Sequence, residues 1–140
     1  MFQVVIDTNV LLAALRSSRG VSYRLLSLIG DARWQLNLSV PLLLEYEDVL
    51  KRSGKALSLT HADIDDILDF ICATANLREV FYLWRPVLLD PKDDFILELA
   101  VESNSDFIVT FNIKDFTGIE KFGLFAITPR EFLQHPGEIR

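Results

Sequence analysis

Four acidic residues of this chain lie at or just after the ends of apolar segments: Asp7, Glu45, Asp93 and Asp115. Carboxylates brought together repel one another by about 4 kcal/mol per close pair at an effective dielectric of about 20, so they need a compensating cation. The chain has one cysteine and two histidines, too few for a Cys/His zinc site. Oxygen ligands alone suit Mg²⁺ or Mn²⁺. The residue types therefore predict metal-assisted chemistry, provided that the fold brings these carboxylates together.

Each of the first two acids also has a purely structural interpretation. Asp7 follows the apolar run Val4-Val5-Ile6, where an aspartate could equally cap the next helix. Glu45 lies at the edge of the apolar stripe of its own helix, whereas its acidic neighbours Glu47 and Asp48 point away from that stripe. The helix dipole explains an acid in the first turn but not its place beside the stripe.

The other two acids follow the same logic. Asp93 precedes Leu97, Ala100 and Val101 on one helical face, so an acid heads an apolar stripe, although it could also form a capping box with Asp90. Asp94 is expected about a quarter-turn away, at the edge of that stripe. Asn112 and Asp115 lie in a polar turn after a strand, where an Asx-turn is the simpler interpretation. A further group of acids is expected on the solvated face of a helix: Asp63, Asp65, Asp66 and Asp69.

Strand-like and helix-like segments alternate along the chain. Strands are expected at residues 2–7, 34–39, 107–111 and 124–128, and helices at residues 10–15, 21–29, 40–50, from 60 onward, 90–103 and 129–133. Residues 77–89 are apolar without a clear period and stay unassigned. Buried strands separated by helices indicate one α/β domain over residues 1–140, with a mostly parallel sheet covered on both faces. In such sheets ligands bind beyond the carboxyl ends of the strands, where these acids are expected.

The composition limits location and partners. Half the residues are hydrophobic, which predicts an independently folding core. The longest uncharged stretch, residues 34–44, is too short to span a membrane, and the start of the chain lacks the pattern of a secretory signal, so we expect a cytoplasmic protein. The net charge of −6 disfavours non-specific attraction to nucleic acid.

Four motifs in this order resemble the signatures of PIN domains: Asp7-Thr-Asn-Val, Leu44-Glu-Tyr-Glu-Asp-Val-Leu50, Asp90-Pro-Lys-Asp-Asp and Ile108-Val-Thr-Phe-Asn-Ile-Lys-Asp-Phe. Within that family the chain is similar to the VapC-like toxin components of bacterial toxin–antitoxin systems. The resemblance implies a three-layer α/β/α fold and a metal-dependent endoribonuclease. It also implies a homodimer and a small antitoxin partner.

The resemblance assigns roles by position. Asp7 and Asp93 would hold one Mg²⁺ or Mn²⁺, while Glu45 and Asp115 would place a second ion or orient water. Many family members carry aspartate at the position of Asn112, so the resemblance implies that Asp115 replaces that carboxylate. Hydrolysis would yield a 5′-phosphate and a 3′-hydroxyl without a covalent intermediate. Supporting residues around the ligands would be Thr8, Asn9, Asp94 and Asn112.

RNA contacts at the rim of the site are expected from Arg16, Arg19 and Lys114, which could equally be ordinary surface charges. Two bound Mg²⁺ would change the balance from −6 to −2 (−6 + 4 = −2). The apolar segment 77–87 is a candidate contact surface, although core packing explains it as well.

Three other functions compete with this one. A non-catalytic PIN-like module that binds RNA or protein stays open, because Asn112 replaces an acid and the chain is acidic. An aspartyl phosphatase would need Asp-x-Asp where the chain has Asp7-Thr8-Asn9, and a dinucleotide-binding enzyme would need a Gly-x-Gly-x-x-Gly loop that is missing.

Overall fold

The computed structural model describes residues 1–17, 19–80 and 93–134. Five strands form one sheet in the order β3-β2-β1-β4-β5, and every neighbouring pair is parallel. The strands are β1 (Phe2–Ile6), β2 (Trp34–Leu38), β3 (Asn76–Leu77), β4 (Phe107–Val109) and β5 (Phe125–Ile127). The helices are α1 (Thr8–Arg16), α2 (Val21–Ser27), α3 (Val40–Arg52), α4 (Gly54–Leu57), α5 (His61–Thr74), α6 (Asp94–Glu102) and α7 (Pro129–Leu133), with 3₁₀ turns η2 (Ile113–Phe116) and η3 (Ile119–Phe122).

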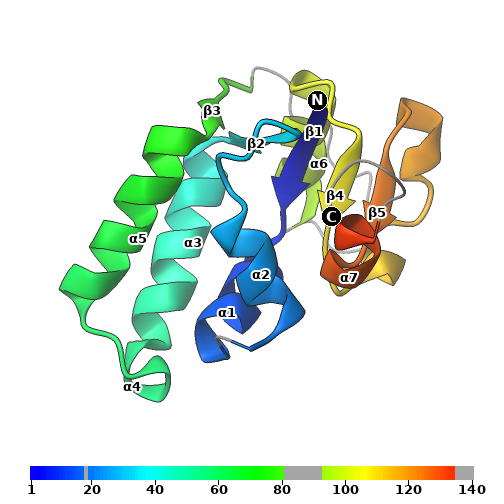
Figure 1. The fold of residues 1–140 in the computed structure, drawn as a ribbon. Coiled ribbons are helices and arrows are strands. Elements are labelled where there is room, and N and C mark those ends of the chain that lie inside the picture. Colours follow the sequence, from blue (N-terminus) through cyan, green and yellow to red (C-terminus); the bar gives the residue numbers. More distant parts are fainter. Residues whose placement is uncertain (18, 81–92, 135–140) are drawn as a thin grey trace.

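The strand order explains how the helices cover the sheet. From β1 the chain steps outward to β2 and β3, then returns to β4 on the other side of β1 (Figure 1). Right-handed crossovers in these two directions place the intervening helices on opposite faces. In agreement, α1 packs on α2 and α3, and α3 packs on α5, while α6 contacts β1, β2 and β4. The predicted three-layer α/β/α fold with a parallel sheet is confirmed.

The core lies on both faces of the central strands. Val4, Val5, Ile108 and Val109 have no exposed surface, which is why these strands read as continuous apolar runs rather than alternating ones. At one side of this core the ring of Phe132 packs edge-on against Trp34 and Phe107. These contacts tie α7 to β2 and β4.

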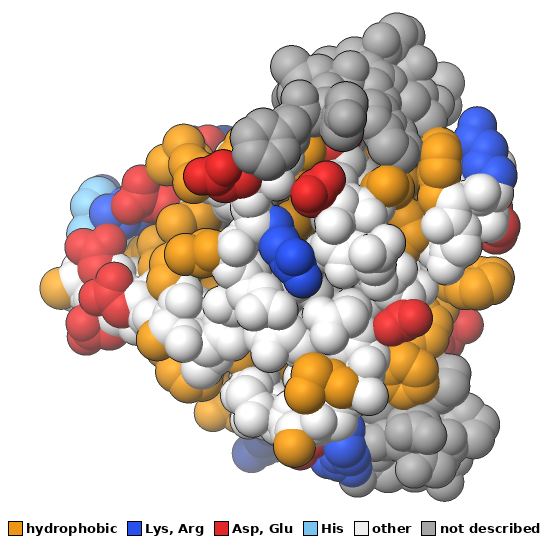
Figure 2. All heavy atoms as spheres, turned by 90° about the horizontal axis from the view of Figure 1, so that it is seen from above, with side chains coloured by type: hydrophobic (Ala, Val, Ile, Leu, Met, Phe, Trp, Pro, Cys, Tyr) orange, Lys and Arg blue, Asp and Glu red, His pale blue; other side chains and the backbone are white. Residues whose placement is uncertain are grey.

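Two predicted helix starts are confirmed together with their capping residues, Ser39 and Thr60. The Ser39 hydroxyl accepts a hydrogen bond from the Leu42 N–H at the start of α3, and Thr60 forms a capping box with Asp63 at the start of α5. The acids of α5 are exposed as expected, and Figure 2 shows acidic side chains gathered near the start of this helix. They form a solvated surface, anchored in part by an ion pair of 2.9 Å between Lys51 and Asp65.

Three expectations need correction or completion. The helix expected to begin after Asp90 is α6, which begins at Asp94 with Asp93 at its N-cap position. Asp90 itself, and all but the first part of the apolar segment 77–87, lie outside the described residues. At the start of the unassigned stretch, Leu77 and the preceding Asn76 form the short edge strand β3, whose pairing with β2 was not predicted from the sequence. None of the helices in the described part of the chain is long and apolar enough to cross a membrane.

Candidate active site

Asp7 stands at the carboxyl end of β1, between β1 and β4. Its N–H donates to the Val109 carbonyl at 2.9 Å, which fixes its backbone beside the end of β4. Its side chain is only 8% exposed and accepts a hydrogen bond of 2.7 Å from the Thr110 hydroxyl. Although Asp7 occupies the N-cap position of α1, its side chain makes no capping hydrogen bond. The capping interpretation therefore does not account for this aspartate.

Glu45 reaches the same place from α3. Its carboxylate accepts a hydrogen bond from the hydroxyl of Thr8, a buried residue at the first position of α1. Glu45 itself is half-buried, in keeping with its predicted place at the edge of the apolar stripe of α3. The Thr8 hydroxyl thus ties the carboxylate of Glu45 to the residue directly after Asp7.

The pKa of Asp7 is affected by burial and by two other carboxylates, those of Glu45 and Asp115. Burial raises the pKa of Asp7, and the negative charges of Glu45 and Asp115 raise it further. Hydrogen bonds from the Thr110 hydroxyl and the Thr8 backbone act in the opposite direction. In the described part of the chain, the ion pairs join other residues: Arg33 with Asp31, Lys51 with Glu47 and Asp65, and Arg52 with Asp48. Glu45 and Asp115 therefore lie near enough to raise the pKa of Asp7, and none of the ion pairs between described residues involves these three carboxylates.

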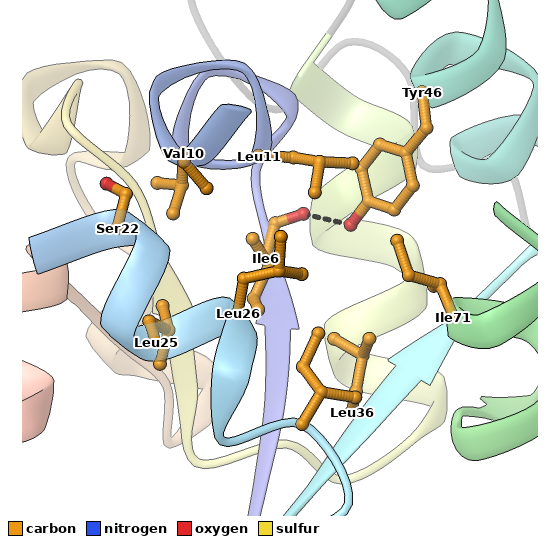
Figure 3. Close-up of a pocket in the computed structure, with 11 residues that line it drawn as sticks. Ile6, Val10, Leu11, Ser22, Leu25, Leu26, Leu36, Tyr46 and Ile71 are labelled. Atoms are coloured by element: carbon orange, nitrogen blue, oxygen red, sulfur yellow. Dashed lines mark hydrogen bonds between the residues drawn. The ribbon is translucent and has the colours of Figure 1, made fainter. Parts of the chain in front are cut away.

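Tyr46 is a buried tyrosine that binds the backbone beside Asp7. Its hydroxyl donates to the carbonyl of Ile6, the residue before Asp7, as Figure 3 shows. Burial raises its pKa well above the ordinary value of 10.0, and the charges of Asp7 and Glu45 add to this effect. The ring also lines a cavity of about 10 Å³, which is at the lower limit for a single water molecule. Sequence reasoning placed Tyr46 in the apolar stripe and missed its hydrogen bond.

The turn after β4 completes the arrangement. The Thr110 hydroxyl, which donates to Asp7, also accepts a hydrogen bond of 3.0 Å from the Asn112 N–H. Asn9 accepts a long hydrogen bond of 3.5 Å from the Phe111 N–H. Asp115 follows in η2 and is half-buried. Thr110 was missed from the sequence; the available signal was a hydroxyl residue directly after a fully buried strand.

The start of α6 differs from expectation. Asp93 is half-buried at the N-cap position, whereas Asp94 is only 1% exposed. The expected order, with Asp93 heading the buried face and Asp94 at its edge, is therefore wrong in terms of burial. The reason is that α6 is buried around most of its circumference, with even Glu98 only 3% exposed, so the stripe analysis could not separate its faces. The charges that shift the pKa of Asp7 include neither residue.

The predicted RNA-contacting residues Arg16, Arg19 and Lys114 are exposed. Their roles stay predictions, as do those of the metal ligands. In the described part of the chain, no three His, Cys, Asp or Glu side chains already surround one ion position. The donor set around Asp7 nevertheless consists of carboxylate, hydroxyl and amide oxygens, which are the ligands preferred by Mg²⁺ and Mn²⁺.

Comparisons with known proteins identify the fold and the family of this chain. No curated protein gives a significant match. Among solved structures, the crystal structure of VapBC2 from Rickettsia felis bound to a DNA fragment from their promoter shares the fold, with a TM-score of 0.64 at 18% identity, covering 91% of this chain and 98% of that one. A family model for the PIN domain matches residues 3–114, a range that includes Asp7, Glu45, Thr110 and Asn112. This chain therefore belongs to the PIN-domain family.

Proposed function

We propose that this protein is a metal-dependent endoribonuclease that hydrolyses RNA phosphodiester bonds. The observation that carries the proposal is the buried carboxylate of Asp7 at the carboxyl end of β1, whose pKa the charges of Glu45 and Asp115 raise, while none of the ion pairs between described residues includes these three acids. Holding such charges together is unfavourable unless a cation binds. Membership of the PIN-domain family makes a nuclease the natural use of that cation.

The ligands would be Asp7, Glu45, Asp115 and a carboxylate from the start of α6. A bound Mg²⁺ or Mn²⁺ supplies Lewis acidity to the phosphodiester and lowers the pKa of an attacking water. The fit with Asp7 is electrostatic: its pKa is raised by burial and by two neighbouring negative charges, and a divalent cation relieves both effects.

The residues of the chain prepare this site. The hydrogen bonds from Thr110 and from the Thr8 backbone favour the ionised form of Asp7 and fix the direction of its oxygens. The Thr8 hydroxyl fixes the direction of one oxygen of Glu45, leaving the other to orient water or to accept its proton. Asn112 offers an amide oxygen but no charge, so the charge on that side of the site comes from Asp115.

The start of α6 offers two candidates for the remaining carboxylate. The resemblance assigns this role to Asp93, and Asp94, which is only 1% exposed, is the other acid at this helix start. Substituting each separately distinguishes them, since asparagine preserves the shape of the side chain and removes the charge.

The test is cleavage of a mixed RNA pool with Mg²⁺, with Mn²⁺ or with EDTA. We compare the wild type with Asp7→Asn, Asp93→Asn and Asp94→Asn, and use Asp66→Asn as the matched control because Asp66 is exposed on α5. Metal-dependent cutting that Asp7→Asn abolishes and Asp66→Asn retains supports the proposal, provided that circular dichroism shows both variants folded. If the wild type cuts equally well in EDTA, the proposed mechanism is wrong.

A role as the toxin of a toxin–antitoxin pair extends the proposal. The VapBC2 structure is described as bound to a promoter DNA fragment, and the two folds align over most of both chains. We infer that this chain acts on cytoplasmic RNA, forms a homodimer and is held inactive by a small antitoxin. Expression of the wild type should then arrest bacterial growth, whereas Asp7→Asn should not, and light scattering should give the mass of a dimer.

A non-catalytic binding module is the second candidate, and one observation favours it. Asn112, an exposed amide, stands where many family members carry an acid. This function would show as RNA retained on the protein with no cutting under any metal condition.

A further inference from the structure

Phe111 is an exposed aromatic residue directly after Thr110, whose hydroxyl bonds the Asp7 carboxylate. Its side chain is 49% exposed, although it follows the fully buried Thr110 directly. Adjacent Cα atoms are about 3.8 Å apart, so the backbone of Phe111 lies within one residue of the hydroxyl that bonds Asp7. An isolated exposed aromatic residue needs no explanation, but the backbone of this one is bonded to Asn9 and follows the residue that bonds Asp7.

Three hydrogen bonds hold the backbone around Phe111 in place. The Thr110 N–H donates to the Ile127 carbonyl of β5 at 2.9 Å, and the Asn112 N–H donates to the Thr110 hydroxyl at 3.0 Å. The N–H of Phe111 itself is directed to the Asn9 side chain at 3.5 Å. The ring is therefore carried by an anchored backbone rather than a loose loop, which lowers the entropy lost when a flat ligand binds.

The residues that follow extend this surface. Ile113 is 38% exposed and adds apolar area, and the exposed Lys114 adds a positive charge. An aromatic ring beside an exposed cation suits a nucleotide, because its base can stack on the ring while its phosphate is attracted to the ammonium group. In the described part of the chain, Lys114 forms no ion pair that would compete for it.

We propose that Phe111 forms a stacking subsite for an unpaired nucleobase next to the bond that is cut. This inference rests on the proposed function. Bases inside an RNA duplex are stacked and paired, and cannot lie flat on a protein ring without being unstacked, whereas loops and single strands offer their faces freely.

The test measures RNA binding in the Asp7→Asn background, so that the probe is not cut. The probes are a short fluorescein-labelled oligouridine and an oligomer of the same length with abasic residues in place of uridine. We expect Phe111→Ala to weaken oligouridine binding by about 5- to 150-fold, since stacking is worth about 1–3 kcal/mol per base. Binding of the abasic oligomer should not change.

Two further variants separate stacking from a structural effect. Phe111→Trp should retain affinity, and its added tryptophan fluorescence should be quenched by the bound base. Phe125→Ala is the matched control: Phe125 is 55% exposed, but it begins β5 and thus lies at the opposite edge of the parallel sheet. It should bind oligouridine normally.

The outcomes separate this inference from the function on which it rests. If the protein binds oligouridine but Phe111→Ala has no effect, or weakens both probes equally, the stacking subsite is wrong and the nuclease proposal stands. The same conclusion follows if Phe125→Ala weakens binding as much as Phe111→Ala. If neither the wild type in EDTA nor Asp7→Asn with Mg²⁺ binds either probe, and the wild type cuts no RNA, both proposals fail.

Discussion

Replacing Thr110 with valine should destabilise the protein through the charge on Asp7. Valine has nearly the shape of threonine but lacks the hydroxyl, so the substitution removes the 2.7 Å hydrogen bond to Asp7 without leaving a cavity. Hydrogen bonds to charged groups contribute about 1.5–3 kcal/mol, and Asp7 is only 8% exposed, so water replaces the lost donor poorly. The exposed Asn112 N–H, which loses its acceptor, can bond to water instead. We expect the free energy of unfolding at pH 7 to fall by about 1.5–3 kcal/mol.

Urea unfolding followed by circular dichroism, in buffer without divalent ions, measures this loss. In the Asp7→Asn background the hydrogen bond is neutral, so Thr110→Val should cost only about 0.5–1.5 kcal/mol. The pH dependence gives a second check. The folded-state pKa of Asp7 lies above its unfolded value, so ionisation of Asp7 lowers stability as the pH rises through the folded-state pKa. Thr110→Val raises that pKa further, so its deficit should be largest at neutral pH and smallest in acid. An equal loss in both backgrounds, or a loss independent of pH, would refute this reasoning.

The remaining predictions concern the same site and one helix start. Asp7→Asn should unfold at higher urea than the wild type at pH 7 without metal, and this advantage should vanish in acid, because it removes a buried charge whose pKa is raised. Tyr46→Phe leaves the buried Ile6 carbonyl without its donor and should cost about 1–3 kcal/mol in urea unfolding, at an unchanged m-value. In an ultraviolet pH titration, Tyr46 should ionise only when the protein unfolds. Thr60→Ala breaks the capping box with Asp63 and should lower the unfolding free energy by about 1 kcal/mol.

Local chemistry made much of this fold predictable. The continuous apolar runs of β1 and β4 predicted strands that are buried on both faces. Ser39 and Thr60 predicted helix starts, because their hydroxyls accept hydrogen bonds from the first turn. Glu45 could be distinguished from Glu47 and Asp48 because the buried residues Leu42, Tyr46 and Leu50 of α3 recur at helical spacing, and Glu45 adjoins that stripe. In each case the information lies within one or two turns of the chain.

The start of α6, and which of its first two acids is buried, could not be predicted from local sequence patterns. A helical-face analysis distinguishes an inner from an outer side only when one side meets water. Because α6 is buried around most of its circumference, the sequence offers apolar residues on every side, and the burial of Asp94 rather than Asp93 depends on where the helix begins. The two-residue strand β3 was not predicted for a related reason: it forms by pairing with β2, and its own residues carry no strand pattern.

The partner of Asp7 could be found only through the strand order. Asp7 and Thr110 are 103 positions apart, and no local pattern connects them. They meet because β4 pairs with β1 instead of with β3, which places the residues after Ile6 and after Val109 side by side at the carboxyl edge. The Asp7 N–H bonds Val109 and the Thr110 N–H bonds Ile127, so the ends of β1, β4 and β5 are tied in sequence across this edge. The orientation of the Asp7 carboxylate is thus set by the pairing of the sheet, and substitutions that disturb the end of β4 should impair the site even where they touch no carboxylate.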